Sequence, residues 1–224
     1  MRYGILCSIG GLLLVAHAVF HGGLDLLWLW PALGLLWVAA GYFFLGARVF
    51  SKQAKQGRLP LPSLLVNAPY LLTTWFIWHL TWLVRREDKH NHIAANLWLG
   101  RRPLHLDELP DSIRLVVDVT SEFNEVRAFV TEREYRCLPM LDGSICRDGQ
   151  ALADLCAELV DFDGDIYIHC AMGHGRSASV LAMVLVRKGL ASSVPEAVRM
   201  MRAQRPRVVL NRAQRRMIEQ LLAE

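Results

Sequence analysis

The chain has 224 residues, which is enough for one domain, or for a domain with an appendage. Its mean hydropathy of +0.25 is high for a soluble protein, and the apolar residues are concentrated before residue 85. The net charge of +4 and the pI of about 8.9 suit an anionic membrane surface or a phosphorylated substrate. Basic residues interleaved with aromatic ones, the pattern of a nucleic-acid platform, are not evident in the second half, so we expect no nucleic-acid partner.

Two long apolar runs, at residues 4–20 and 24–47, are separated by a turn at His21-Gly-Gly. Each approaches the length of about 20 residues that a membrane-spanning helix needs. We therefore predict two transmembrane helices that form a hairpin. An alternative stays open for the first run, because Arg2, the apolar core and Ala16-His-Ala18 imitate a secretory signal peptide that would be cleaved after the small residues.

Basic residues gather in the loop that follows: Arg48, Lys52, Lys55 and Arg58. Such loops lie on the cytoplasmic side of a membrane. A third apolar run, at residues 64–84, contains more polar residues and has basic residues on both flanks. This pattern favours a segment in the cytoplasmic interface, whereas a true third span would place the rest of the chain outside. We predict an integral membrane protein, expected in a bacterial inner membrane, with an anchor at residues 1–88 and a cytoplasmic domain at residues 90–224.

The second half alternates between two kinds of pattern. Segments typical of strands lie at residues 93–99, 114–119, 135–138 and 166–168. Segments typical of helices lie at residues 121–134, 150–160 and 177–188, and two further helix starts are Ser193-x-x-Glu196 and Asn211-x-x-Gln214. Strands that alternate with helices predict an α/β fold in which helices flank a central sheet and the site lies at the carboxyl end of a strand.

Five cysteines are spread irregularly along the chain, at positions 7, 137, 146, 156 and 170. Their odd number and their spacing are typical neither of a disulfide framework nor of a zinc site. A reactive thiol works most easily where thiols stay reduced, which also favours the cytoplasm. Since no group of His, Asp or Glu residues has metal-ligand spacing, we expect an activity that needs no metal and no cofactor.

One stretch carries the chemistry. A short strand-like run ends in His169-Cys170, and a glycine-containing loop leads to Arg176-Ser177 at the start of an apolar helix. A strand, a turn and a helix start form an anion cradle that stabilises a thiolate, and Arg176 adds a planar donor suited to phosphate oxygens. The expected phosphate-binding residues are Ala171, Met172, Gly173, His174, Gly175 and Arg176. The alternative is a buried structural cysteine in an ordinary strand-to-helix turn.

The pattern His-Cys-x-x-Gly-x-x-Arg-Ser, which begins at His169, resembles the signature loop of the cysteine-dependent phosphatases. Residues 90–222 as a whole resemble the dual-specificity branch of these enzymes. The resemblance implies that the Cys170 thiolate attacks phosphorus and forms a phosphocysteine. Ser177 is expected to help the thiolate leave when water cleaves that intermediate, and His169 to support the thiolate through the backbone of the turn.

The departing alkoxide needs a proton from a side chain that reaches over the cradle. Asp142 lies in a loop that contains proline and glycine, where a mobile acid could close on the substrate. In the dual-specificity phosphatases that this chain resembles, the acid comes from such a loop a few dozen residues before the cysteine. Asp142 is therefore the predicted general acid, and Asp148 is the alternative, unless it only caps the next helix.

A narrower resemblance concerns the substrate. Asn96-Leu-Trp-Leu-Gly100, the stretch 117–125 and the tail 202–214 are similar to the mitochondrial-type phosphatidylglycerophosphate phosphatases. This likeness and the apolar anchor imply a lipid phosphate as substrate and the bilayer as partner. The alternative is a membrane-tethered phosphatase of phosphotyrosine, phosphoserine or phosphothreonine in proteins. Four arginines could line the approach to the cradle, or could be ordinary solvated residues: Arg101, Arg102, Arg205 and Arg207.

Overall fold

The computed structural model describes residues 2–85 and 87–223, and the chain divides into two compact units. One unit contains Met1–Gln53 and Leu59–Glu87, and the other contains Ala54–Arg58 and Asp88–Glu224. The short segment Ala54–Arg58 therefore belongs to the second unit, although the chain on either side of it belongs to the first.

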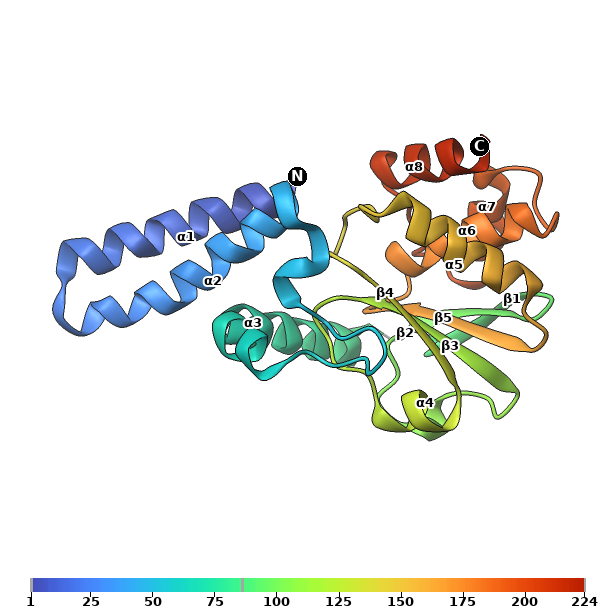
Figure 1. Cartoon of the computed structure of the whole chain (residues 1–224), viewed down its shortest axis with the longest axis horizontal. Coiled ribbons are helices and arrows are strands. Elements are labelled where there is room, and N and C mark those ends of the chain that lie inside the picture. The colour runs from blue at the N-terminus through green and yellow to red at the C-terminus, as the bar shows by residue number, and fades with distance from the viewer. Residues whose placement is uncertain (1, 86, 224) are drawn as a thin grey trace. The chain divides into compact units, whose positions relative to one another are not determined.

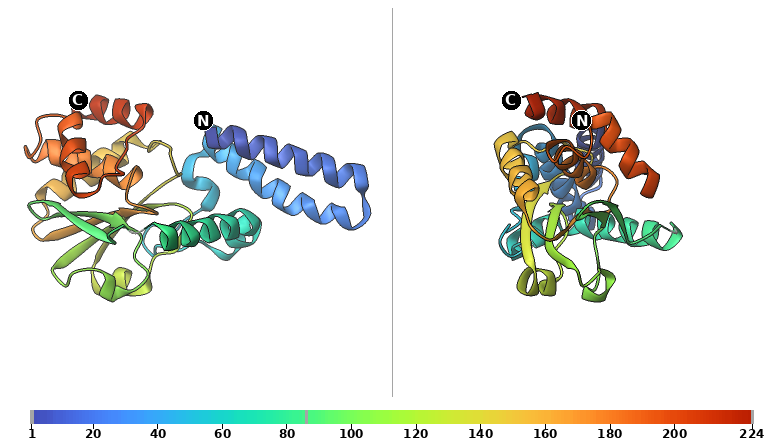
Figure 2. Two further views of the ribbon diagram at one scale, coloured as in Figure 1. Left: turned by 180° about the vertical axis from the view of Figure 1, so that it is seen from behind. Right: turned by 90° about the vertical axis from the view of Figure 1, so that its right-hand side faces the viewer.

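The first unit begins with a helical hairpin, drawn in blue in Figures 1 and 2. Its elements are α1 (Arg2–His21), η1 (Gly23–Trp28) and α2 (Leu29–Ala40). Glycine permits the close approach of α1 to α2, because a Cβ at Gly11 would lie 2.7 Å from Leu36 Cγ. The two apolar runs of the sequence therefore pack against each other as antiparallel helices.

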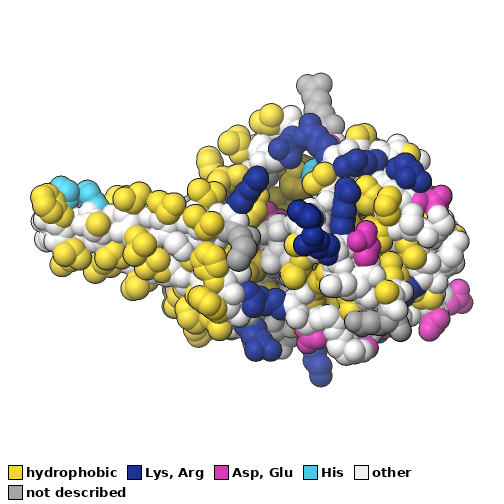
Figure 3. Space-filling model, turned by 90° about the horizontal axis from the view of Figure 1, so that it is seen from above, with side chains coloured by type: hydrophobic (Ala, Val, Ile, Leu, Met, Phe, Trp, Pro, Cys, Tyr) yellow, Lys and Arg dark blue, Asp and Glu magenta, His cyan; other side chains and the backbone are white. Residues whose placement is uncertain are grey.

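The outer surface of this hairpin is apolar. Hydrophobic side chains cover it along its length in Figure 3, and Phe20 is 85% exposed. In the part of the chain that the structure describes, two helical segments are long and apolar enough to cross a membrane: Arg2–His21 and Gly23–Phe50. Exposed apolar surface of this extent is typical of a segment that meets lipid or another protein.

The second apolar run is a regular α-helix only as far as Ala40, not to residue 47. A π-helical turn, η2 (Gly41–Leu45), and a 3₁₀ turn, η3 (Gly46–Phe50), follow before α3 (Leu61–Val84). The carbonyl groups freed by this change are satisfied by side chains: Trp37 Nε1 donates to Val49 O at 3.0 Å, and Ser63 Oγ donates to Phe50 O at 2.7 Å.

The second unit is built on a five-stranded sheet in the order β1-β2-β5-β3-β4. The strands are β1 (His90–Ala94), β2 (Leu97–Arg101), β3 (Ile113–Thr120), β4 (Glu134–Met140) and β5 (Asp165–Cys170). Only the pairing of β1 with β2 is antiparallel; β2, β5, β3 and β4 run parallel. The predicted α/β fold is confirmed, and β5, which carries the cysteine motif, is the central strand.

Helices cover both faces of this sheet, as Figure 1 shows. They are η4 (Leu106–Glu108), α4 (Arg127–Glu132), α5 (Gly149–Asp161), α6 (Arg176–Arg187), α7 (Val194–Gln204) and α8 (Arg212–Ala223). One core cluster joins the sheet to α5, α6, α7 and α8, and a smaller one places Phe129 of α4 against the opposite face. Helix α6 is the most deeply buried, which fixes the position of its first residue, Arg176.

Two predicted elements are wrong. The segment 93–99 is not one strand but the end of β1 and the start of β2, joined by a turn in which Ala95 has a φ of +47°. The predicted helix at 121–134 is helical only over Arg127–Glu132. The residues before it use their side chains on local backbone groups and on distant partners, as Ser121 Oγ does with Met140 O at 3.0 Å, and this competes with helix formation.

Candidate active site

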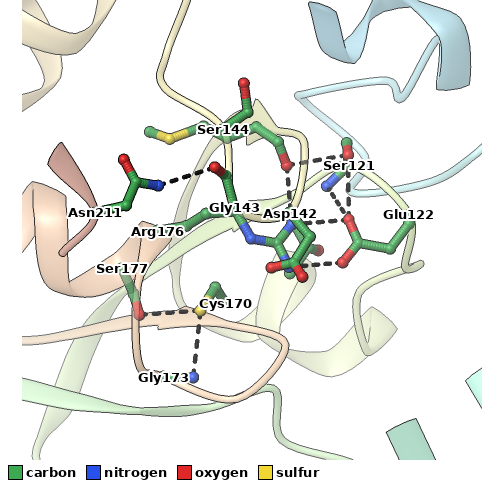
Figure 4. Close-up of polar contacts among 12 residues, drawn as sticks. Ser121, Glu122, Asp142, Gly143, Ser144, Cys170, Gly173, Arg176, Ser177 and Asn211 are labelled. Carbon is green, nitrogen blue, oxygen red and sulfur yellow. Dashed lines mark hydrogen bonds and ion pairs between the residues drawn. The ribbon is translucent and has the colours of Figure 1, made fainter. Parts of the chain in front are cut away.

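The predicted phosphate loop, residues 171–175, lies between the carboxyl end of β5 and the start of α6. Figure 4 shows Cys170, Arg176 and Ser177 converging there. Gly173 has a φ of +74°, and a Cβ at this position would collide with the backbone of Gly100 in β2. The turn therefore needs glycine, both for its conformation and for its close approach to the neighbouring strand.

The thiol of Cys170 is buried and receives two hydrogen bonds. The backbone N–H of Gly173 donates to Sγ at 3.2 Å, and Ser177 Oγ donates to it at 3.3 Å. Burial alone would raise the pKa of this thiol, but the charge of Arg176 and the hydrogen bonds from Ser177 lower the pKa below its ordinary value. The site therefore favours the thiolate, which is the nucleophilic form of cysteine.

The guanidinium of Arg176 is 1% exposed and is held by an acidic partner. Nη1 and Nη2 donate to the two carboxylate oxygens of Glu122 at 2.8 and 2.7 Å, and Nη1 also donates to Met140 O at 2.8 Å. Burial disfavours the charge, but Glu122 and Asp142 hold the pKa of Arg176 well above its ordinary value. Among the described residues, the buried Nε–H has no hydrogen-bond partner, which leaves a donor for an anion.

The geometry separates the two candidate acids. The Asp142 carboxylate lies 3.3 Å from Nη2 of Arg176, and its side chain is 60% exposed. Asp148 instead caps helix α5, where its carboxylate accepts a hydrogen bond from the backbone N–H of Ala151 at 2.9 Å. Figure 4 shows Asp142 beside Arg176.

Two amide side chains hold the loop that carries Asp142. Asn211 and Gln214 cap the start of α8 reciprocally, since the side-chain oxygen of each accepts the backbone N–H of the other at 3.0 Å. Their amide nitrogens then donate outward, Asn211 Nδ2 to Gly143 O at 2.9 Å and Gln214 Nε2 to Ser144 O at 3.1 Å. The sequence indicated only a helix start at Asn211. The contact of Asn211 and Gln214 with the loop at residues 142–144, called the acid loop below, was not predicted.

A buried polar layer lies behind the cysteine. His169 Nε2 is 2.8 Å from Glu125 Oε2, and both side chains are fully buried. Asp118 lies close by, so the ligand atoms of the three residues are within 4.8 Å of one another, near enough to hold a metal ion. The Asp118 carboxylate is, however, already hydrogen-bonded by Thr120 and by Tyr135. The predicted support of the thiolate by His169 through the backbone stays a prediction, and the structure adds the pairing of its side chain with Glu125.

The expectation that four arginines line the approach is wrong for two of them. Arg101 is buried and pairs with Glu108. Arg205 is buried and donates to Met172 O at 2.9 Å, so it braces the phosphate loop from behind. Arg102 is half-buried, and its guanidinium donates to Asn124 O.

Of the four, only Arg207 is exposed. Charged side chains that lie next to a glycine-rich loop are thus used here to satisfy backbone carbonyl groups, a role that the sequence did not reveal.

A thiolate-stabilising loop after a central parallel strand, with a buried arginine at the start of the next helix, defines a cysteine-dependent phosphatase, an enzyme that hydrolyses phosphomonoesters. Residues 97–222 match the catalytic domain of the dual specificity phosphatases. The chain belongs to this family, as the sequence motif predicted.

Three of the solved structures that resemble this chain are Tk-PTP, human DUSP28 and PTPMT1. Tk-PTP in its active form is 23% identical, with a TM-score of 0.54, over 61% of this chain and 97% of its own. Human DUSP28 is 20% identical, with a TM-score of 0.51, over 60% and 93%. PTPMT1 in complex with PI(5)P is 18% identical, with a TM-score of 0.49, over 61% and 98%. No curated protein matches the chain in sequence.

Proposed function

We propose that this protein is a membrane-anchored phosphatase that hydrolyses a lipid phosphomonoester through a phosphocysteine on Cys170. The observation that carries the mechanism is the environment of the Cys170 sulfur, which has two hydrogen-bond donors and the charge of Arg176 beside it. An isolated buried thiol would have a raised pKa, as Cys156 does, whose pKa burial raises to about 12. The difference between the two thiols is the reason for assigning the nucleophile to Cys170.

The first step transfers the phosphoryl group to the enzyme. The Cys170 thiolate attacks phosphorus, the phosphorus–oxygen ester bond breaks, and Asp142 donates a proton to the departing oxygen. The backbone N–H groups of residues 171–175 and the Nε–H of Arg176 hold the phosphoryl oxygens as negative charge accumulates. The Asp142 carboxylate, which pairs with Arg176 in the structure, must take up a proton and leave that pair before it acts as the acid, and its exposed loop permits the movement.

The second step releases phosphate. A water molecule attacks the phosphocysteine, its proton passes to the Asp142 carboxylate, and the sulfur–phosphorus bond breaks. Ser177 Oγ, 3.3 Å from the Cys170 sulfur, donates to the departing thiolate and makes it a better leaving group. The reaction begins and ends with the same protonation states, so the enzyme is ready for another substrate.

A lipid substrate is favoured by the apolar N-terminal region. Two helical segments of adequate length and hydropathy would hold the enzyme at a bilayer, where phosphorylated lipid headgroups are concentrated. The sequence likeness to the mitochondrial-type phosphatidylglycerophosphate phosphatases supports the same class of substrate. The second candidate, a phosphoprotein phosphatase, is favoured by the dual-specificity family to which the domain belongs.

The test is phosphate release by the full-length protein in detergent micelles. Phosphatidylglycerophosphate and phosphoinositides are compared with a phosphotyrosine peptide, and the Cys170→Ser protein serves as the blank. The account predicts preference for a lipid and no turnover by the variant. Preference for the peptide would make the protein a membrane-tethered protein phosphatase, and turnover by Cys170→Ser would overturn the mechanism for either substrate.

A further inference from the structure

The segment Ala54–Arg58 is a short loop between η3 and α3, yet it folds with the phosphatase unit. Gly57 is buried, whereas Gln56 and Arg58 on either side of it are exposed. Its carbonyl oxygen accepts a hydrogen bond of 2.7 Å from the backbone N–H of Glu125. The loop thus contributes a backbone hydrogen bond to the unit that carries the active site.

The position requires glycine for two reasons. The φ of Gly57 is +63°, in the left-handed region that residues with a Cβ rarely adopt. A Cβ at this position would also lie 2.6 Å from Tyr135 Oη and 2.7 Å from Glu125 Cβ, closer than real Cβ contacts come. The backbone of the loop therefore rests directly on these two side chains.

Both contacts of Gly57 lead to the layer behind the nucleophile. The Glu125 carboxylate is 2.8 Å from Nε2 of His169, the residue that precedes Cys170 in β5. Tyr135 Oη donates at 3.0 Å to the carboxylate of Asp118, which is the strand partner of His169 across β3 and β5. Glu125 is buried among packed groups and Tyr135 is half-buried, so a displacement of Glu125 must be taken up by its neighbours, His169 among them.

We infer that Gly57 is a positioning residue for the phosphatase reaction: its backbone fixes Glu125, and through Glu125 it fixes His169 directly behind Cys170. The inference rests on the proposed role of Cys170 as nucleophile. The matched family domain, residues 97–222, does not contain Gly57. The loop Ala54–Arg58, which lies outside the matched domain, therefore adds a positioning residue to the phosphatase unit.

The test uses full-length protein in detergent with p-nitrophenyl phosphate as substrate. Gly57→Ala should lower kcat by about tenfold or more, because displacement of supporting groups by a fraction of an ångström misaligns the nucleophile. Gly189→Ala is the matched control: Gly189 has a φ of +70° but no atom within 4 Å of an added Cβ. The Gly189→Ala variant therefore has a similar backbone strain but no new side-chain contact, and its kcat should stay near that of the wild type.

A second readout separates positioning from general destabilisation. The rate of inactivation by iodoacetate, measured against pH, reports the apparent pKa of the Cys170 thiol, which also faces Arg176 and Asp142. Gly57→Ala should shift this profile, whereas Gly189→Ala should not. Unchanged kcat and an unchanged profile in Gly57→Ala would overturn the inference. Activity in Cys170→Ser would instead refute the proposed nucleophile, so the two failures are distinguishable.

A measurement on the unmodified protein covers the case in which Gly57→Ala does not fold. The Glu125 amide is hydrogen-bonded to Gly57 O, so its hydrogen exchange should be slow in the folded enzyme. Fast exchange of this amide, with protection retained in the neighbouring strand β3, would show that the loop is not docked and would also overturn the inference.

Discussion

The two loops over the active site are built in opposite ways. The phosphate loop is braced on several sides: Arg205 donates to Met172 O, and the backbone N–H of Arg102 donates to Ala171 O. The acid loop at 142–144 is held from α8 by the two amides of Asn211 and Gln214, and Asp142 itself is exposed. A rigid cradle suits a phosphoryl group whose charge builds up at fixed positions. A movable loop suits a side chain that must approach the substrate, donate a proton in the first step and accept one in the second.

The largest loss of activity is expected from a change at Arg176, which follows the rigid phosphate loop. Arg176→Lys keeps the positive charge but loses the planar contact with Glu122 and the Nε–H donor, so kcat should fall by about 10²- to 10³-fold. Steady-state kinetics with p-nitrophenyl phosphate measures this. Arg187→Lys, at the other end of α6, is the control and should retain activity, because Arg187 is exposed and donates to carbonyl groups away from the site. Equal losses in both variants would contradict the assigned role of Arg176.

The next effect concerns the acid itself. Asp142→Asn should lower kcat/KM, which reports the step that forms the phosphocysteine, by about 10²-fold on an alkyl phosphate, whose leaving oxygen needs a proton. The loss should be smaller on p-nitrophenyl phosphate, because its leaving group departs as a stable phenolate. Asp148→Asn is the matched control, since asparagine caps a helix as well as aspartate does. An equal loss on both substrates would argue against general acid catalysis by Asp142.

The loop contact can be broken without touching Asp142. Asn211→Asp keeps the side-chain oxygen that caps α8 but removes the Nδ2 donor to Gly143 O. We expect kcat to fall by about three- to tenfold, as is usual when a residue that only orients the acid is altered. The melting temperature should hardly change because the cap is kept. An unaltered kcat would show that this hydrogen bond does not hold the acid in place.

The smallest effect is expected at Ser177. Its hydrogen bonds help lower the pKa of the Cys170 thiol, so the thiolate persists to lower pH than an ordinary cysteine allows. Ser177→Ala removes the side-chain donor, raises this pKa and should move the acidic limb of the kcat/KM profile to higher pH. A profile that moves to lower pH would contradict the assigned hydrogen bond.

Local patterns were predictable and distant partners were not. The stretch from His169 to Ser177 lies on consecutive residues, so its strand, turn and helix could be recognised from the sequence alone. Glu122 contacts Arg176 across 54 residues, and Asn211 contacts Gly143 across 68. Nothing in the local pattern of either residue indicates those partners. The first contact depends on the pairing of β3 with β5, and the second on the packing of α8 against α5 and α6.

The same limit explains the wrong predictions. The charge spacing at 121–134 is typical of a helix, but Ser121 and Glu122 bind groups brought to them by β4 and α6. Arg101 and Arg205 look like surface cations in the sequence and are buried in the fold. The sequence favoured Asp142 over Asp148 through its loop and through the family resemblance, and the structure adds that Asp142 lies beside Arg176 and Asp148 at a helix start.

The most direct test of the account is detection of the covalent intermediate. Full-length Asp142→Asn protein, in which hydrolysis of the intermediate should be slow, is mixed with p-nitrophenyl phosphate and quenched in acid. The peptides are then analysed by mass spectrometry. The account predicts one added phosphoryl group on the peptide that contains Cys170, and none when Cys170 is also replaced by serine. Phosphate release without a phosphorylated Cys170 peptide would contradict the central claim.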